Sequence, residues 1–193
     1  SKGILPGIKV DKGAVDLPGS QGEKITEGLD GLKERLIEYA ELGARFAKWR
    51  AVITIGENIP TDKCIGTNAE VLAKYAFLCQ EQDIVPIVEP EVLMDGDNTL
   101  EICRNVTNRT LKALFTKLKD NNVILEGLIL KTNMIISGKK CPVQASGKEI
   151  AKETVETFLE VVPKEIAGIV FLSGGQTPDQ ATENLAEINK VPG

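Results

Sequence analysis

Residues 84–92 read IVPIVEPEV, an apolar and β-prone stretch that ends among charged residues. Side chains two positions apart on a strand lie on the same face of a sheet. Glu89 and Glu91 are therefore expected to point to the same side. A buried strand that ends in two carboxylates on one face predicts a functional site at the end of a sheet.

Two other stretches have the same character, GARFAKWRAVITIG (43–56) and EGLILKTN (126–133). By the same period of two, Lys48 shares a face with Arg50 on the first stretch, and Lys131 points to one face at the end of the second. If the three strands lie side by side, acids and lysines converge on one site. A lysine amine among carboxylates suits carbonyl chemistry through a Schiff base better than other common reactions.

Composition removes several rival chemistries. The chain contains no histidine, which argues against imidazole-based triads, His-ligated zinc and the usual proton shuttle at neutral pH. Its four cysteines have no CxxC spacing, so neither a disulfide framework nor a thiolate zinc site is expected. These cysteines are Cys64, Cys79, Cys103 and Cys141.

Length and charge indicate a globular protein. With 193 residues and 42% hydrophobic content, the chain is expected to form a single domain over residues 1–193. The formal net charge is −5, with acids and bases interspersed, so neither nucleic acid nor a membrane surface is an expected partner. No signal-peptide pattern opens the sequence and no window approaches the roughly 18 apolar residues of a membrane helix, which predicts a cytoplasmic location.

Hydrophobic periodicity predicts five strands that alternate with five helices. The strands are expected at about 6–10, 47–55, 84–89, 124–131 and 167–172, and the helices at about 26–43, 62–82, 98–121, 147–162 and 178–190. Ser146 with Glu149, and Thr177 with Gln180, fit the capping box that begins a helix. Regular β-α alternation predicts an α/β fold with stacked units in a parallel sheet or barrel.

The unusual residues follow the predicted strands, where parallel α/β folds gather their sites. Asp11, Lys12 and Gly13 follow GIKV, and Gly174, Gly175 and Gln176 follow FLS. Serine and two glycines ahead of a helix can offer backbone N–H groups to a phosphate.

Five motifs in order resemble the class I, Schiff-base-forming fructose-1,6-bisphosphate aldolases. They are GIKVDKG (7–13), AKWR (47–50), IVEPE (87–91), LILKTNM (128–134) and FLSGGQ (171–176). The resemblance implies a TIM (β/α)₈ barrel and a glycolytic lyase that cleaves fructose 1,6-bisphosphate to dihydroxyacetone phosphate and glyceraldehyde 3-phosphate. It also implies a cytoplasmic homotetramer with a phosphorylated sugar as substrate and no metal or other cofactor.

Carried over residue by residue, the resemblance makes Lys131 the Schiff-base lysine and Glu89 the general acid and base. It makes Lys48 a stabiliser of developing charge, and Glu91 a support for the neighbouring cations. The residues expected to bind substrate or its phosphates are Lys9, Arg50, Ser173 and Gly174.

Two departures from the family pattern stand out. The family usually has K-P-N after its Schiff-base lysine, whereas this chain has Thr132 and Asn133. A complete barrel also needs about 250 residues and eight strands, and the resemblance places the five predicted strands third to seventh. We therefore expect a partial barrel, the central portion of a longer polypeptide, which alone would associate and turn over little substrate.

Other readings stay open on sequence alone. Glu89 and Lys131 could form an interior ion pair without catalysis. The chain could be a non-catalytic aldolase-like scaffold or an inactive fragment, or another Schiff-base aldolase of the TIM-barrel class, such as a deoxyribose-phosphate aldolase or transaldolase. Residues 172–176 spell LSGGQ, the ABC-ATPase signature, but no GxxxxGK[ST] loop accompanies it.

Overall fold

The computed structural model describes residues 2–192, and its centre is a parallel sheet of five strands in the order β1-β4-β5-β6-β7. The strands are Gly7–Lys9 (β1), Phe46–Ile53 (β4), Val85–Val92 (β5), Ile129–Thr132 (β6) and Gly168–Phe171 (β7). Because the spatial order follows the chain order, each new strand joins the same advancing edge. The prediction of a parallel α/β sheet with five βα units is confirmed.

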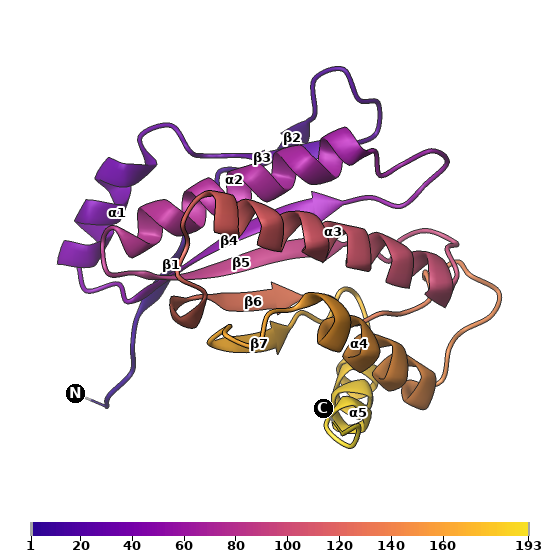
Figure 1. Cartoon of the computed structure of the whole chain (residues 1–193). Helices are drawn as coiled ribbons and strands as arrows, with labels where there is room; N and C mark the ends of the chain where they lie inside the picture. Colours follow the sequence, from indigo (N-terminus) through magenta and orange to yellow (C-terminus); the bar gives the residue numbers. More distant parts are fainter. Residues whose placement is uncertain (1, 193) are drawn as a thin grey trace.

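The helices are Leu32–Glu41 (α1), Asp62–Gln80 (α2), Leu100–Asp120 (α3), Gly147–Val161 (α4) and Pro178–Ile188 (α5). Of these, α2 and α3 pack on one face of the sheet, α1 packs against α2, α4 against α3, and α5 against α4 (Figure 1). Trp49 of β4 is fully buried in the layer between sheet and helices, with its ring centroid 5.4 Å from that of Tyr75 on α2. Leu111 and Leu114 of α3 belong to the same core. This burial fixes which face of each strand points away from the helices.

The opposite face of the sheet carries the charged residues predicted to converge. On β4, Ala47, Trp49 and Ala51 are buried toward the helices, whereas the alternate residues Lys48 and Arg50 point the other way. This face is only partly covered: Val170 of β7 is 44% exposed. Within residues 2–192, β1 and β7 are the two edges and do not pair with each other. The sheet is therefore open in the part of the chain that the structure describes.

The predicted helix at 26–43 is wrong over its first third. Residues Gly13–Asp16 (β2) and Lys24–Glu27 (β3) form an antiparallel hairpin, and α1 begins only at Leu32. Gly28 and Gly31 have positive φ angles of 128° and 64°, a conformation that glycine adopts readily and other residues rarely do. These glycines stop the hairpin from continuing into a helix.

The other predicted elements match more closely. The strand expected at 124–131 begins with the 3₁₀ turn Leu125–Gly127 (η1), so β6 itself is shorter. Both predicted capping boxes are confirmed: Ser146 and Glu149 cap α4, and Thr177 and Gln180 cap α5. Both capped helices begin at the residues predicted for them, Gly147 and Pro178.

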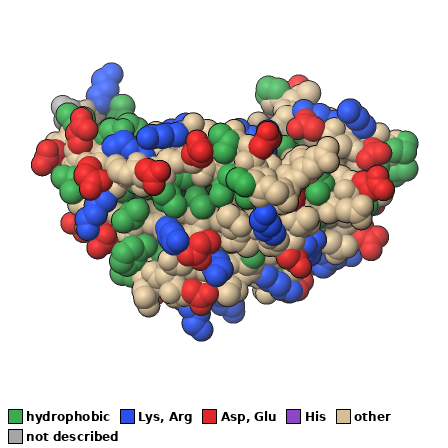
Figure 2. All heavy atoms as spheres, turned by 90° about the horizontal axis from the view of Figure 1, so that it is seen from above, with side chains coloured by type: hydrophobic (Ala, Val, Ile, Leu, Met, Phe, Trp, Pro, Cys, Tyr) green, Lys and Arg blue, Asp and Glu red, His purple; other side chains and the backbone are tan. Residues whose placement is uncertain are grey.

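The surface carries acidic and basic side chains mixed together, as Figure 2 shows for one face. The four cysteines are free and buried. Burial raises the pKa of the Cys64 thiol to about 11 and that of Cys79 to about 12. Among residues 2–192, no helix is long and apolar enough to cross a membrane.

Candidate active site

Glu89 lies between two lysines on the partly covered face of the sheet. Its carboxylate is 3.2 Å from the Lys131 Nζ of β6 and 3.1 Å from the Lys48 Nζ of β4. Glu89 is buried, whereas the lysine side chains remain 31% and 22% exposed. The structure thus brings the three residues together on three adjacent strands. A buried carboxylate between two amines can exchange protons with a reacting group that reaches either amine.

Asp11, which lies two residues after β1, contacts the lysines of β1 and β4. Its carboxylate is 2.6 Å from the Lys9 Nζ and 3.8 Å from the Lys48 Nζ. It also accepts a hydrogen bond from the Arg50 backbone amide at 3.3 Å. Since only 3% of the Asp11 side chain is exposed, its charge is compensated mainly by these groups. Asp11 therefore fixes where the cations of β1 and β4 lie.

Arg50 and Glu91 form the outer end of the cluster. The Arg50 Nε is paired with the Glu91 carboxylate across β4 and β5. Burial raises the pKa of the Glu91 carboxyl, and the nearby Arg50 guanidinium only partly opposes this effect. Arg50 is 44% exposed, so part of its guanidinium still faces solvent. Glu91 thus contacts the cation that it was expected to support.

The Ser173–Gly175 loop lines a cavity of about 540 Å³ beside this cluster. The other lining residues belong to β4, β5, β6 and β7 and to the loops after β5 and β6, and they include Arg50, Glu89, Glu91, Lys131 and Lys139. Gly174 and Gly175 have positive φ angles of 60° and 89°. Within residues 2–192, their amides donate to no protein acceptor, so they are available to an anion in the cavity.

Asn133 joins β6 to β5 and α3 through hydrogen bonds of its side chain. It follows Thr132, the last residue of β6, and its Oδ1 accepts a hydrogen bond from the Val92 amide of β5 at 3.1 Å. Its Nδ2 donates to the Thr107 Oγ1 of α3 at 3.2 Å. Both hydrogen bonds are buried, so Asn133 fixes the relative position of the strands that carry Glu89 and Lys131.

With this arrangement established, comparison with known proteins identifies the family. The family model described as "Glycolytic: Fructose-bisphosphate aldolase class-I" matches residues 1–193. The chain belongs to the class-I fructose-bisphosphate aldolase family. The resemblance drawn from five sequence motifs is therefore confirmed.

Individual aldolases are similar over nearly the entire chain. A probable fructose-bisphosphate aldolase class 1 of Xanthomonas campestris pv. campestris is 60% identical over 98% of this chain and 57% of its own length. Fructose-bisphosphate aldolase 4, cytosolic, of Arabidopsis thaliana is 51% identical over 99% of this chain and 49% of its own length. This chain spans about half the length of the curated relatives it matches.

A solved aldolase structure has the same fold over this region. It is a ternary co-crystal structure of fructose-bisphosphate aldolase from Plasmodium falciparum in complex with TRAP and a small-molecule inhibitor. It matches with a TM-score of 0.96 and 47% identity, covering 98% of this chain and 56% of the Plasmodium chain. The open sheet thus has the arrangement of the corresponding half of a class-I aldolase.

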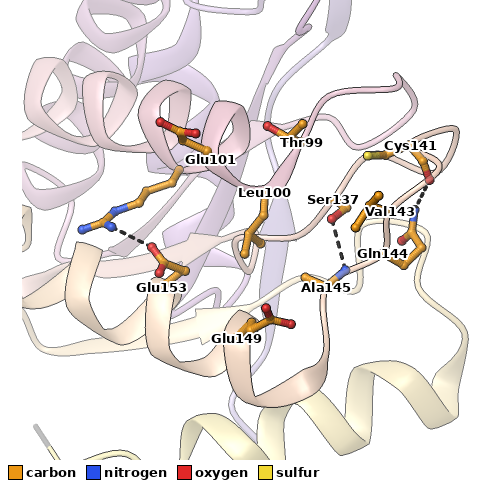
Figure 3. A pocket seen from close by; sticks show the side chains of 11 residues that line it. Thr99, Leu100, Glu101, Ser137, Cys141, Val143, Gln144, Ala145, Glu149 and Glu153 are labelled. Atoms are coloured by element: carbon orange, nitrogen blue, oxygen red, sulfur yellow. Dashed lines mark hydrogen bonds and ion pairs between the residues drawn. The ribbon is translucent and has the colours of Figure 1, made fainter.

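A second cavity, of about 520 Å³, lies near the N-terminal ends of α3 and α4 (Figure 3). Several of its polar side chains already have partners: Arg104 pairs with Glu153 at 2.7 Å, and the Ser137 Oγ accepts a hydrogen bond from the Ala145 amide. Glu149 forms the capping box of α4. None of the residues predicted for the aldolase site lines this cavity.

Sequence reasoning gave no role to three residues of the site. Asp11 directly follows a predicted strand, and this position is the sequence signal that points to it. Asn133 is part of the LILKTNM motif, yet its contacts cross to β5 and α3, which the sequence does not reveal. Lys139 lies in the loop after β6, where no periodicity indicates the direction of a side chain.

Proposed function

We propose that the protein carrying this chain is a fructose-bisphosphate aldolase. It would cleave fructose 1,6-bisphosphate reversibly to dihydroxyacetone phosphate and glyceraldehyde 3-phosphate in glycolysis and gluconeogenesis. The observation that carries the proposal is the Glu89 carboxylate between the amines of Lys131 and Lys48, at 3.2 and 3.1 Å. Membership of the class-I aldolase family supports the choice of substrate.

The proposed reaction begins at Lys131. Its unprotonated Nζ adds to the substrate ketone and forms a carbinolamine, whose hydroxyl leaves as water after Glu89 supplies a proton. The resulting iminium withdraws the electron pair of the C3–C4 bond as this bond breaks, and the Glu89 carboxylate, which has given up its proton, accepts the proton of the C4 hydroxyl as the aldehyde forms. The aldehyde product departs, and the enamine is protonated at C3 and hydrolysed by water to release dihydroxyacetone phosphate and the free lysine.

The surrounding cations have complementary roles in this proposal. Lys48 stabilises negative charge that develops near the bond being broken. Lys9 and Arg50, which are about half exposed, contact the substrate and its phosphate. Ser173 and Gly174 hold the phosphate of the triose half through the loop after β7. Glu91 positions Arg50.

At the level of the whole protein, we propose that residues 1–193 form one domain that supplies the third to seventh strands of a TIM barrel. The TM-score of 0.96 to an aldolase of which this chain covers 56% supports this placement. We further propose a cytoplasmic homotetramer, with the location supported by the similarity to a relative named cytosolic.

Borohydride trapping tests the proposal directly. The complete protein is incubated with dihydroxyacetone phosphate and reduced, and the labelled residue is located by mass spectrometry. We expect one stable adduct, on Lys131, together with cleavage of fructose 1,6-bisphosphate. A Lys131→Arg variant should lose both, whereas Lys140→Arg, which changes an exposed lysine in a neighbouring loop, should lose neither.

The same experiment separates the alternatives. A folded protein that forms no adduct would be a non-catalytic scaffold. Trapping at Lys131 combined with cleavage of a different sugar phosphate would indicate another Schiff-base aldolase. Tight binding of Mg-ATP would favour the nucleotide-binding reading of LSGGQ (172–176), a segment that instead lies between β7 and α5 beside the cavity.

A further inference from the structure

Lys139 is a cation of the cavity that neither the five motifs nor the proposed mechanism uses. It lies in the loop between β6 and α4, and it lines the same cavity as Lys131 and the Ser173–Gly175 loop. Its amine lies so close to Gly175 that a Cβ atom built there would overlap the Nζ. A glycine at 175 thus lets a lysine amine reach the backbone of the phosphate-binding loop.

The backbone that carries Lys139 is firmly held. Three main-chain hydrogen bonds join its loop to the loop after β5: the amides of Gly138, Lys139 and Lys140 donate to the carbonyls of Asn98, Met94 and Gly96 at 2.8, 2.7 and 2.9 Å. The position from which the Lys139 side chain extends is therefore fixed by main-chain atoms. The position of the Lys139 Nζ within the cavity then depends only on the side-chain torsion angles.

The partner of Lys139 leaves its amine available. The Nζ is 3.2 Å from the Asp95 carboxylate, and the two side chains are 45% and 69% exposed. Ion pairs this exposed are weak, because water solvates both charges and the side chains lose freedom when they pair. A dianionic phosphate held by the amides of Gly174 and Gly175 would compete successfully with Asp95 for the ammonium group.

We propose that Lys139 is a phosphate-binding residue that determines specificity. Its ammonium group and the amides of Gly174 and Gly175 together bind the phosphate of the substrate's triose half, next to the ketone that Lys131 attacks. This inference rests on the proposed function and extends it. Lys139 would make the site prefer phosphorylated ketones over the same ketones without phosphate.

The test compares two ketones in borohydride trapping by the complete protein, at constant ionic strength. Dihydroxyacetone phosphate and dihydroxyacetone both offer a ketone to Lys131, but only the first has a phosphate. We expect Lys139→Gln to raise the half-saturating concentration of dihydroxyacetone phosphate about tenfold, the loss of one charged contact. The value for dihydroxyacetone should be unchanged.

Two matched variants control for charge and for folding. Lys140→Gln removes the same charge from the adjacent exposed residue, which does not line the cavity, and should alter neither value. Lys139→Arg keeps the charge and should retain most of the preference. If Lys139→Gln shifts the two ketones equally or shifts neither, the proposal is wrong.

A titration with inorganic phosphate keeps this proposal independent of the proposed function. If neither ketone is trapped by the wild-type protein, the aldolase proposal fails, but phosphate affinity can still be measured by calorimetry. Lys139→Gln should then weaken phosphate binding severalfold, whereas Lys140→Gln should not. Equal phosphate affinities in the wild type and Lys139→Gln would overturn the role of Lys139.

Discussion

Buried carboxylates in this chain are compensated in two different ways, and the difference separates structural from functional residues. Glu23, in the loop between β2 and β3, is buried and accepts hydrogen bonds from the Thr61 amide and Oγ1, both at 2.7 Å. Glu89 is buried beside two amines that remain partly exposed to a cavity. The neutral donors of Thr61 give Glu23 a structural role, whereas the amines beside Glu89 stay partly exposed, and we propose that they act on substrate.

Glu23 should make folding stability depend on pH in a defined direction. Burial raises its pKa, but the hydrogen bonds from Thr61 outweigh burial, so the pKa of Glu23 lies below the ordinary value of 4.5. The unfolded state therefore binds more protons than the folded state just below pH 4.5, and the stabilisation is lost as pH falls through this range. At pH 7, Glu23→Gln should lose about 2 kcal/mol of unfolding free energy.

Urea denaturation at several pH values measures this effect. The gap between wild type and Glu23→Gln should be widest at neutral pH and should narrow below pH 4.5. Glu27→Gln removes an exposed carboxylate from the same hairpin and should cost little at any pH. A gap for Glu23→Gln that stays constant down to pH 3 would contradict the proposed origin of its stability.

At the scale of elements, two glycines are expected to have opposite effects on folding stability, because different atoms surround them. At Gly138, in the loop after β6, a Cβ would overlap the Gly96 carbonyl oxygen and lie 2.7 Å from the Asn98 Oδ1. At Gly66, inside α2, a Cβ would meet nothing within 4 Å. The first glycine permits two loops to touch, and the second only weakens a helix.

Alanine substitutions at these two glycines should therefore change stability in opposite directions. Gly138→Ala must push the two loops apart and should cost about 1–3 kcal/mol. Gly66→Ala should stabilise by about 0.5–1 kcal/mol, because alanine favours the helix. Thermal unfolding of both variants of the complete protein measures the difference. Stabilisation by Gly138→Ala would show that the loops are not in tight contact.

At the scale of the whole molecule, the partly covered sheet face determines whether the chain is expected to associate with other copies. This face combines a charged cluster with apolar side chains such as Val170, and β1 and β7 present edges that do not pair with each other in residues 2–192. Unpaired edges and exposed apolar surface promote association between chains. In a closed barrel, further strands would pair with both edges and cover this face.

A polypeptide of these 193 residues, produced on its own, should therefore associate in solution. We expect light scattering after size-exclusion chromatography to show species larger than a monomer, with little formation of the Lys131 adduct. The complete protein is the control and should form a defined oligomer with full trapping. A stable monomer of the 193-residue polypeptide with full cleavage activity would refute this prediction.

The sequence predicted the direction of the site residues because strands impose a period of two. Glu89, Lys48 and Lys131 could be placed on one face from their spacing alone, and their convergence needed only that the strands be neighbours. The β2–β3 hairpin was missed because its residues are mostly exposed or half-buried, so neither strand has the apolar face that reveals a period of two. Lys139 was missed because its direction depends on contacts between two loops distant in sequence.

The loop that carries Lys139 is held by hydrogen bonds between main-chain atoms, and this has an evolutionary consequence. Every residue except proline brings the same amide and carbonyl groups, so the shape of this loop is largely independent of the side chain at position 139. Mutations there can alter what the cavity selects while the catalytic scaffold remains intact. Substitution at this single position is therefore expected to change substrate preference with little effect on folding.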